Sequence, residues 1–89
     1  MRAIVTVVGK DKVGIIAGVC TVLAEYNVNI LDIRQTVMQG YFTMMMVTDV
    51  SGSQLPVAEL AKTLEEKGQT MNLSIRLQRE DIFDAMHRV

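Results

Sequence analysis

The sequence is poor in the residues that mark several common classes of protein. It has one cysteine and no tryptophan, and aromatic residues make up 4% of its 89 positions. One cysteine excludes an internal disulfide and a multi-cysteine metal site, and so few aromatics leave no platform for stacking nucleic-acid bases. Lys and Arg number 9 against 10 Asp and Glu, so the basic excess of a general nucleic-acid binder is missing.

Long apolar runs and targeting signals are missing as well. No uninterrupted apolar run approaches the roughly 20 residues that span a membrane. Arg2 is followed by a strand-like run and then by charged Lys10, Asp11 and Lys12, which is unlike a signal peptide. We therefore expect a reduced, cytoplasmic protein without a metal or cofactor. Hydrophobic residues make up 49% and charged residues 21%, which is typical of a single compact domain over residues 1–89.

The spacing of apolar residues predicts four strands and three helices. Alternating or continuous apolar patterns indicate strands, whereas recurrence every three to four residues indicates helices. The second main helix is expected to carry Pro56 in its first turn and Gly68 at its C-terminal cap. The expected strands cover residues 3–8, 28–38, 41–50 and 70–78, and the expected first and last helices cover 15–26 and about 79–88.

This order of elements predicts an α+β fold of the ferredoxin-like βαββαβ kind. We expect a four-stranded antiparallel sheet in the order 4-1-3-2, two helices on one face, and a short extra C-terminal helix. The first and third strands are apolar on both sides and suit the centre of the sheet. The second alternates apolar residues with Asp32, Arg34 and Thr36, which suits an edge, and Gln39-Gly40 predicts a hairpin turn to the third.

The helices of this fold leave the other face of the sheet uncovered. That face is expected to carry Ile4, Val8, Met45 and Val47, or else the set on the other side of the same strands; either set is apolar and favours burial. The terminal helix and the sheet of a partner subunit are the two candidates for covering it. We expect a homodimer in which both contribute.

The turn between the first strand and the first helix is the best candidate for a binding site. Residues 9–18 read GKDKVGIIAG, with three glycines in ten positions. A strand that enters a helix through such a turn leaves unpaired backbone N–H groups at the positive end of the helix dipole, which suits an anionic group. Asp11 is interpreted either as the helix N-cap or as a contact for a ligand amino group. Asn27 suits the left-handed turn that ends this helix.

The chain offers little for catalysis. Gly9 and Gly14 have the spacing of a phosphate-binding loop, but Ile15 and Ile16 stand where that loop needs Lys and Ser or Thr. Cys20 lies beside the apolar stripe of the first helix and is interpreted as a core residue. His87 has no nearby partner for catalysis or metal binding and is interpreted as a surface residue. A nucleophile with its base is absent from the pattern, so we expect no enzyme activity and no catalytic residues.

The chain resembles the ACT domain family, in particular its short stand-alone proteins of bacteria and archaea. The most specific feature is Asp11 and Gly14 together with the pair Asn29-Ile30. Serine-binding members carry a polar ring side chain at the position of Gly9 and Asn at that of Asp11, so serine itself is not the expected ligand. The stretches that carry the resemblance are VVGKDKVGIIAGV, LAEYNVNILDIRQTV, YFTMMMV and EEKGQTMNLSIRLQREDIFDAM.

The resemblance implies a non-catalytic regulatory protein that binds a small molecule, commonly an amino acid, between two paired subunits. It implies that the first turn of one subunit faces the start of the second strand of the other. The alternative is a dimerisation or protein-interaction module that has kept the scaffold without the ligand. Either function would act through a separate protein partner or through the oligomer. A hydrolase of this fold would need an arginine in the first turn, which carries lysines only. Carried over by position, the ligand-binding residues are Lys10, Asp11, Lys12, Val13, Gly14, Asn29, Ile30 and Leu31.

Overall fold

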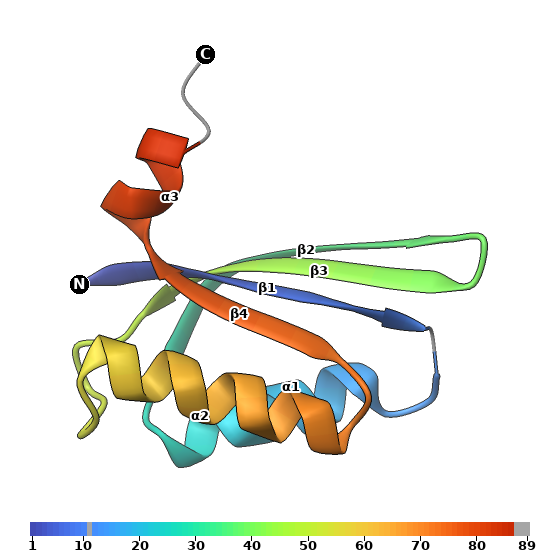
Figure 1. Cartoon of the computed structure of the whole chain (residues 1–89), viewed down its shortest axis with the longest axis horizontal. Helices are drawn as coiled ribbons and strands as arrows, with labels where there is room; N and C mark the ends of the chain where they lie inside the picture. The colour runs from blue at the N-terminus through green and yellow to red at the C-terminus, as the bar shows by residue number, and fades with distance from the viewer. Residues whose placement is uncertain (11, 87–89) are drawn as a thin grey trace.

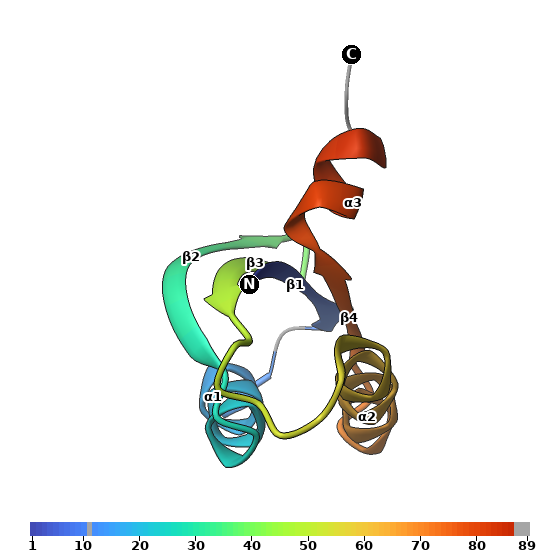
Figure 2. The ribbon, with the colours of Figure 1, turned by 90° about the vertical axis from the view of Figure 1, so that its left-hand side faces the viewer.

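The protein is a layer of sheet packed on a layer of two helices (Figure 1, Figure 2). The computed structural model describes residues 1–10 and 12–86. The order of elements confirms the predicted βαββαβ plan with a terminal helix. In chain order they are β1 (Arg2–Lys10), α1 (Ile15–Glu25), β2 (Asn29–Met38), β3 (Tyr41–Asp49), α2 (Val57–Thr70), β4 (Ser74–Arg79) and α3 (Glu80–Met86).

The four strands form one antiparallel sheet in the order β2-β3-β1-β4, which is the predicted order counted from the opposite edge. β1 and β3 are the central strands, as their two-sided apolar pattern predicts. Gln39 and Gly40 have φ values of 56° and 81°, which is the left-handed pair that a tight hairpin between β2 and β3 requires. The hairpin turn predicted from Gln39-Gly40 is thus confirmed.

The core lies between the sheet and the helices α1 and α2. Alternate residues of each central strand point into it, because side chains alternate across a strand. α1 contributes residues spaced by four, and α2 contributes Leu60 and Leu64, which gives each helix one buried stripe. The buried residues of β1, β3 and α1 are Ala3, Val5, Val7, Phe42, Met44, Met46, Ile15, Val19 and Leu23.

The starts of the two main helices differ from the sequence prediction. Gly14 occupies the N-cap position of α1, whereas Asp11 was the predicted cap; Asp11 lies outside the described residues. Pro56 is the N-cap of α2, one position before the first helical turn in which it was expected. Its fixed φ of −57° matches that position, and Pro56 O accepts the N–H of Leu60 at 2.9 Å.

α1 ends in a hydrogen-bonded turn built on Asn27. This residue has a left-handed φ of 57°, as predicted, and its N–H donates to Ala24 O at 3.1 Å. The next residue, Val28, donates its N–H to Leu23 O at 3.0 Å. The two bonds form a Schellman motif, which satisfies carbonyls that the helix end would otherwise leave unpaired.

α2 ends in the same motif, and this corrects two predictions. Asn72, with φ 58°, occupies the left-handed position, and Leu73 N donates to Gly68 O at 2.8 Å. The predicted cap Gly68 lies inside α2, where an added Cβ would lie 2.9 Å from Ile75 Cγ1 and 2.9 Å from Leu73 O. Gly68 therefore permits close packing of α2 on β4. The predicted strand over 70–78 begins only at Ser74, because the motif takes up the residues before it.

β2 contains a bulge near its start. Ile30 pairs with Thr48 and Asp32 pairs with Val47, so Leu31 is an extra residue. Beyond the bulge Asp32 and Arg34 point to the face of the sheet opposite the helices, and Ile33 points to the helix side. Plain alternation along the strand would put Leu31 on the same side as Ile33, and the bulge interrupts that alternation at Leu31.

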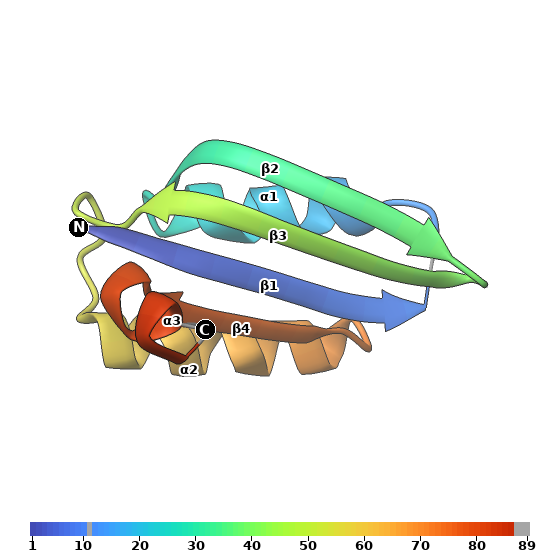
Figure 3. The ribbon, with the colours of Figure 1, turned by 90° about the horizontal axis from the view of Figure 1, so that it is seen from above.

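The face opposite α1 and α2 carries α3 at one end (Figure 3). α3 follows β4 directly and extends away from the sheet. Arg2 at the start of β1 is joined to Glu80 of α3 by an ion pair of 2.8 Å. Within residues 1–10 and 12–86, no helix has both the length and the apolar character to cross a membrane.

Candidate ligand site

The β1–α1 turn has the geometry expected of a small-ligand site. Gly14 is left-handed, with φ 88°, and outside its chain neighbours and its own helix no atom of residues 1–10 and 12–86 lies within 4 Å of the place where its Cβ would be. Its carbonyl accepts the N–H of Gly18 at 2.9 Å, which is the first bond of α1. The N–H groups of the residues between them have no acceptor within the helix, so donors are available at the positive helix end.

A cavity of about 300 Å³ opens beside this helix start. It lies against the first turn of α1 and against Phe42 of β3, and among the described residues that line it Lys12 is the one with a charged side chain. The combination of apolar walls, unpaired backbone donors and one cation suits a small molecule with an anionic group. The lining residues are Lys12, Gly14, Ile15, Ile16, Ala17 and Phe42.

The lysines and Val13 of the turn take different roles. Lys12 Nζ donates to Met71 O at 2.6 Å, which ties the turn to the end of α2. Lys10 is the last residue of β1 and pairs with Tyr41. Val13 is fully exposed. The structure thus places Lys12 and Gly14 at the cavity, whereas Lys10 and Val13 do not line it.

Gly9 shows why a polar ring side chain is absent from this turn. A Cβ at Gly9 would lie 2.5 Å from Leu73 Cδ2 and 3.4 Å from Asn72 O. The first distance is shorter than any ordinary van der Waals contact, and the second is at the lower limit of one. Leu73 is buried, so the space beside Gly9 is filled by the core. The side chain that serine-binding members carry at this position has no room without repacking of Leu73.

The second predicted segment lies at the opposite end of the sheet. Asn29 pairs with Asp49, which in turn pairs with Arg2 at the start of β1. Lys10 is eight residues further along β1, or roughly 27 Å at about 3.4 Å per residue. Asn29 and Leu31 are exposed and Ile30 is half-buried. One chain therefore does not bring Asn29, Ile30 and Leu31 together with the β1–α1 turn.

Sequence reasoning missed Phe42 as a wall of the cavity and Asp49 as the neighbour of Asn29. Phe42 reaches the cavity because it pairs with Gly9 across the central strands, a register that the sequence pattern does not give. The hydroxyl and backbone N–H of Ser51, followed by the ammonium of Met1, hold the pKa of the Asp49 carboxyl at about 2. Ser51 N donates to Asp49 Oδ1 at 2.9 Å, an Asx turn that the sequence Asp-Val-Ser permits.

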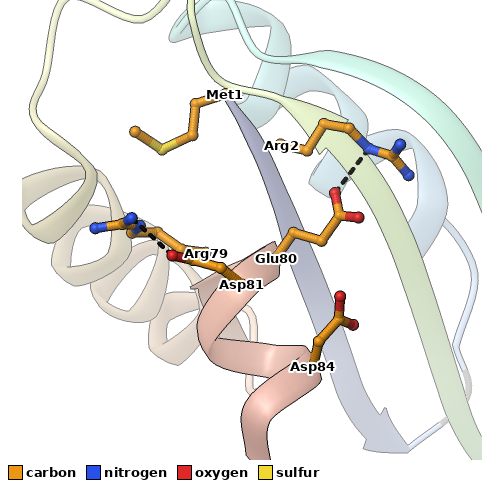
Figure 4. A pocket seen from close by; sticks show the side chains of 6 residues that line it. All are labelled: Met1, Arg2, Arg79, Glu80, Asp81 and Asp84. Carbon is orange, nitrogen blue, oxygen red and sulfur yellow. Dashed lines mark hydrogen bonds and ion pairs between the residues drawn. The ribbon is translucent and has the colours of Figure 1, made fainter.

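A larger hollow, of about 510 Å³, lies between α3 and the start of β1 (Figure 4). Four of its five charged side chains, all but Asp84, form ion pairs with one another: Arg2 Nε with Glu80 Oε2 and Arg79 Nη2 with Asp81 Oδ2, both at 2.8 Å. These pairs leave little net charge to attract a ligand, and the groups are too exposed to contribute much stability. The hollow is a poorer candidate than the cavity at α1.

The described residues were also compared with the requirements of a metal site and of a reactive thiol. No group of three or more His, Cys, Asp or Glu among residues 1–10 and 12–86 is arranged to hold a metal ion. Cys20 has a free thiol and is half-buried on α1, next to the buried Val19, so it lies at the margin of the core rather than inside it. His87 lies outside the described residues.

Comparison with known proteins agrees with this architecture. Residues 2–78 match the family model of the ACT domain. A UPF0237 protein of Clostridium acetobutylicum is 56% identical over 89 residues, all of both chains, and one of Methanocaldococcus jannaschii is 47% identical over 99% of this chain and 98% of its own. The solved ACT domain protein from Streptococcus pneumoniae superposes with a TM-score of 0.83 at 49% identity, covering 98% of each chain. The chain belongs to the ACT domain family.

Proposed function

We propose that this chain is a non-catalytic regulatory protein that binds an amino acid at the interface of a homodimer. The observation that carries the proposal is the open cavity at the start of α1, where Gly14 leaves room for a ligand beside unpaired backbone donors. Lys12 also lines this cavity, and its ammonium donates to Met71 O. A ligand carboxylate is the complementary group.

The free edge of β2 supports the second half of the proposal. β2 is an edge strand of ten residues that runs from Asn29 to Met38, and the row of Met38, Tyr41 and Lys10 lies at the β1–α1 end. Antiparallel pairing of two β2 edges about a two-fold axis puts the Asn29 end of one copy beside the Met38 end of the other. The partner's β2 start then lies near this chain's turn.

Regulation would follow from differential binding. A ligand held by the turn of one subunit and the β2 start of the other binds only the paired arrangement, so it shifts the population toward that arrangement. A separate protein partner would respond to the shift. The hydrogen bond from Lys12 to Met71 O, which joins the turn to the end of α2, is the contact that a ligand carboxylate would compete for.

Thermal unfolding at fixed protein concentration, with each amino acid at millimolar concentration, tests the proposal. A ligand present at 100 times its dissociation constant adds roughly 2.7 kcal/mol to the folded assembly, which for a domain of this size raises the midpoint by about 10 °C or more. A selective rise for one chemical class of amino acid is the expected result. A flat panel with a folded, associated protein would contradict ligand binding.

Gly14→Ala and Gly40→Ala form a matched pair for locating the site. Both glycines are left-handed, at φ 88° and 81°, and both have nothing within 4 Å of an added Cβ, so each variant carries the same kind of backbone strain. Only Gly14 borders the cavity. We expect loss of the ligand response in Gly14→Ala and its retention in Gly40→Ala. Equal responses would place the ligand elsewhere.

A ligand-free assembly module is the second candidate, and the packing around Gly9 favours it. The space for a polar contact at that position is taken by Leu73. Under this alternative the protein associates in the absence of amino acids and shows no response to any of them. Recovery of one specific protein partner, with affinity unchanged by amino acids, would then support it.

A further inference from the structure

β4 leaves one side of its backbone without a partner strand. It is the outer strand at the edge of the sheet farthest from β2 (Figure 3), and among residues 1–10 and 12–86 it pairs with β1 alone. In an antiparallel pair every second residue directs both its N–H and its C=O away from the neighbouring strand. These groups form a row along the free edge, where the backbone of another extended segment can pair with them.

A groove runs beside this edge, between β4 and α2. We use "β4 groove" for two hollows of about 480 and 370 Å³, which adjoin because Ala61, Leu77 and Gln78 border both. α2 lies on one side of the sheet at β4, and α3 rises on the other side (Figure 2). The groove is therefore open along the edge of the strand. The apolar residues that line its larger hollow are Val57, Ala58, Ala61, Leu77 and Ile82.

Neighbouring residues of β4 offer different chemistry to the two sides of an added strand. Ile75 and Leu77 are buried in the core beneath the sheet, so Arg76 between them points to the opposite side. Arg76 is exposed, borders the groove, and has no ion-pair partner among residues 1–10 and 12–86. Arg79, by contrast, is paired with Asp81 at 2.8 Å. An added strand would thus place apolar residues beside α2 and an acidic residue beside Arg76.

We propose that the β4 groove binds an extended segment of a separate protein in which an acidic residue stands between two apolar residues. The free edge favours an extended chain, because it offers backbone donors and acceptors at the spacing of a strand. The six residues of β4 extend roughly 20 Å at about 3.4 Å per residue, which fits a partner segment of similar length.

Charge complementarity favours a separate protein over a second copy of this chain. β4 reads SIRLQR, with two arginines and no acidic residue, so a paired copy of β4 would bring no carboxylate to Arg76. Glu65 of α2 borders the smaller hollow as well, but it forms no ion pair with Arg76 in the described part of the chain. The charge of Arg76 therefore remains for the partner.

The β4 groove is separate from the surfaces of the proposed ligand-binding dimer. The cavity at α1 is lined by the first turn of that helix and by Phe42 of β3, and β2 forms the opposite edge of the sheet. A dimer paired through β2 would present one β4 groove at each of its outer edges. Binding of the segment does not depend on binding of an amino acid.

Fluorescence anisotropy with two labelled peptides tests the proposal. The first, Gly-Ser-Thr-Val-Asp-Leu-Thr-Ser-Gly, carries the proposed alternation, and the second has Lys in place of Asp. We expect saturable binding of the Asp peptide to the native chain, weakened by about three- to tenfold in Arg76→Glu, which should in turn prefer the Lys peptide. Arg34→Glu is the matched control, because Arg34 lies in the same row of the sheet on the opposite edge. It should leave both affinities unchanged.

Ala58→Gln and Ala24→Gln form a second matched pair, for the apolar side of the groove. Both alanines are exposed residues of helices, and glutamine is a good helix former. Ala58 borders the groove, whereas Ala24 lies on α1. We expect Ala58→Gln to weaken binding of the Asp peptide and Ala24→Gln to leave it unchanged. Circular dichroism shows whether each variant is folded.

Hydrogen exchange followed by NMR identifies the backbone contact. Every second amide of residues 74–79 is expected to exchange more slowly once the Asp peptide is bound. Three results overturn the proposal: no saturable binding to the native chain, equal affinity for the native chain and folded Arg76→Glu, or slow exchange of all these amides without peptide. The last result would assign the edge to a second copy.

The peptide titrations are run without amino acids, so they separate this proposal from ligand binding. Peptide binding together with a flat amino-acid panel supports the β4 groove and contradicts the ligand site. An amino-acid response without peptide binding supports the ligand site and overturns the β4 groove.

Discussion

Replacing Gly68 by alanine is expected to destabilise the protein, although alanine is the better helix former. Gly68 lies in the last turn of α2, two residues before the helix ends at Thr70. An added Cβ would lie 2.9 Å from Ile75 Cγ1 and 2.9 Å from Leu73 O. The second atom belongs to the backbone of the turn that leads into β4, so it cannot rotate away as a side chain can.

Whether Gly68→Ala raises or lowers the free energy of unfolding depends on two opposing contributions. Alanine in place of glycine within a helix stabilises by about 1 kcal/mol, and extra volume in a packed core costs about 1–3 kcal/mol. Because α2 must shift away from β4, the larger cost applies and we expect a net loss of about 1–2 kcal/mol. For a domain of this size, that lowers the unfolding midpoint by roughly 5–15 °C.

Gly18→Ala is the matched control, because Gly18 is also a glycine inside a helix. The nearest atom to its added Cβ is the Met71 sulfur at 3.3 Å, the flexible part of a side chain. We expect this variant to be between neutral and about 1 kcal/mol more stable than the native chain. Circular dichroism melts of both variants at equal concentration give the comparison. A Gly68→Ala midpoint equal to that of Gly18→Ala would refute the steric argument.

Two further predictions concern a carboxylate and a helix end. The folded-state pKa of Asp49 is about 2, below its unfolded value of about 3.9. The carboxylate therefore contributes stability above pH 4 that is lost as the pH falls toward 2. Asp49→Asn is expected to flatten that part of a profile of melting temperature against pH, and an unchanged profile would contradict the prediction. Asn72→Ala is expected to cost about 1 kcal/mol in urea unfolding, because φ at this position is 58°, whereas Asn72→Gly should be near neutral.

The sheet could be predicted from the sequence because its pattern and its topology agree. The two strands with apolar residues on both sides, such as Val5 beside Ile4 and Met46 beside Met45, are the central ones. The half-polar strands are the edges. Gln39-Gly40 required a left-handed hairpin turn, and only a few residue pairs permit one.

The errors arose where tertiary contacts decide the role of a residue. A glycine near a helix end suggests a cap, but Gly68 is required by its distance to β4 and Asn72 is the residue that ends the helix. The alternation of Met71, Asn72 and Leu73 resembles a strand, and hydrogen bonds back to α2 make it a turn. No local pattern reveals these contacts.

Of the two segments predicted to form the ligand site, the sequence correctly located only the β1–α1 turn at a cavity. The glycine-containing turn of Lys12 and Gly14 is local in sequence, and the structure places both at the cavity. The Phe42 wall depends on strand pairing, and the filling of the space beside Gly9 depends on Leu73. The distance between the turn and Asn29 also depends on topology, because β1 and β2 run from the same end of the sheet.

The bulge in β2 makes the chain unevenly tolerant of changes in length. Removing one residue from the regular part of β2 would reverse every later side chain, and Arg34 would exchange sides with Ile33. Leu31 is the exception, because it has no partner on β3 and the strand keeps its alternation without it. Leu31 is also half exposed and lies in the segment that the family resemblance marks for the ligand. Insertions and deletions between relatives should therefore concentrate at this single position, where a binding surface can be altered without changing the sheet that supports it.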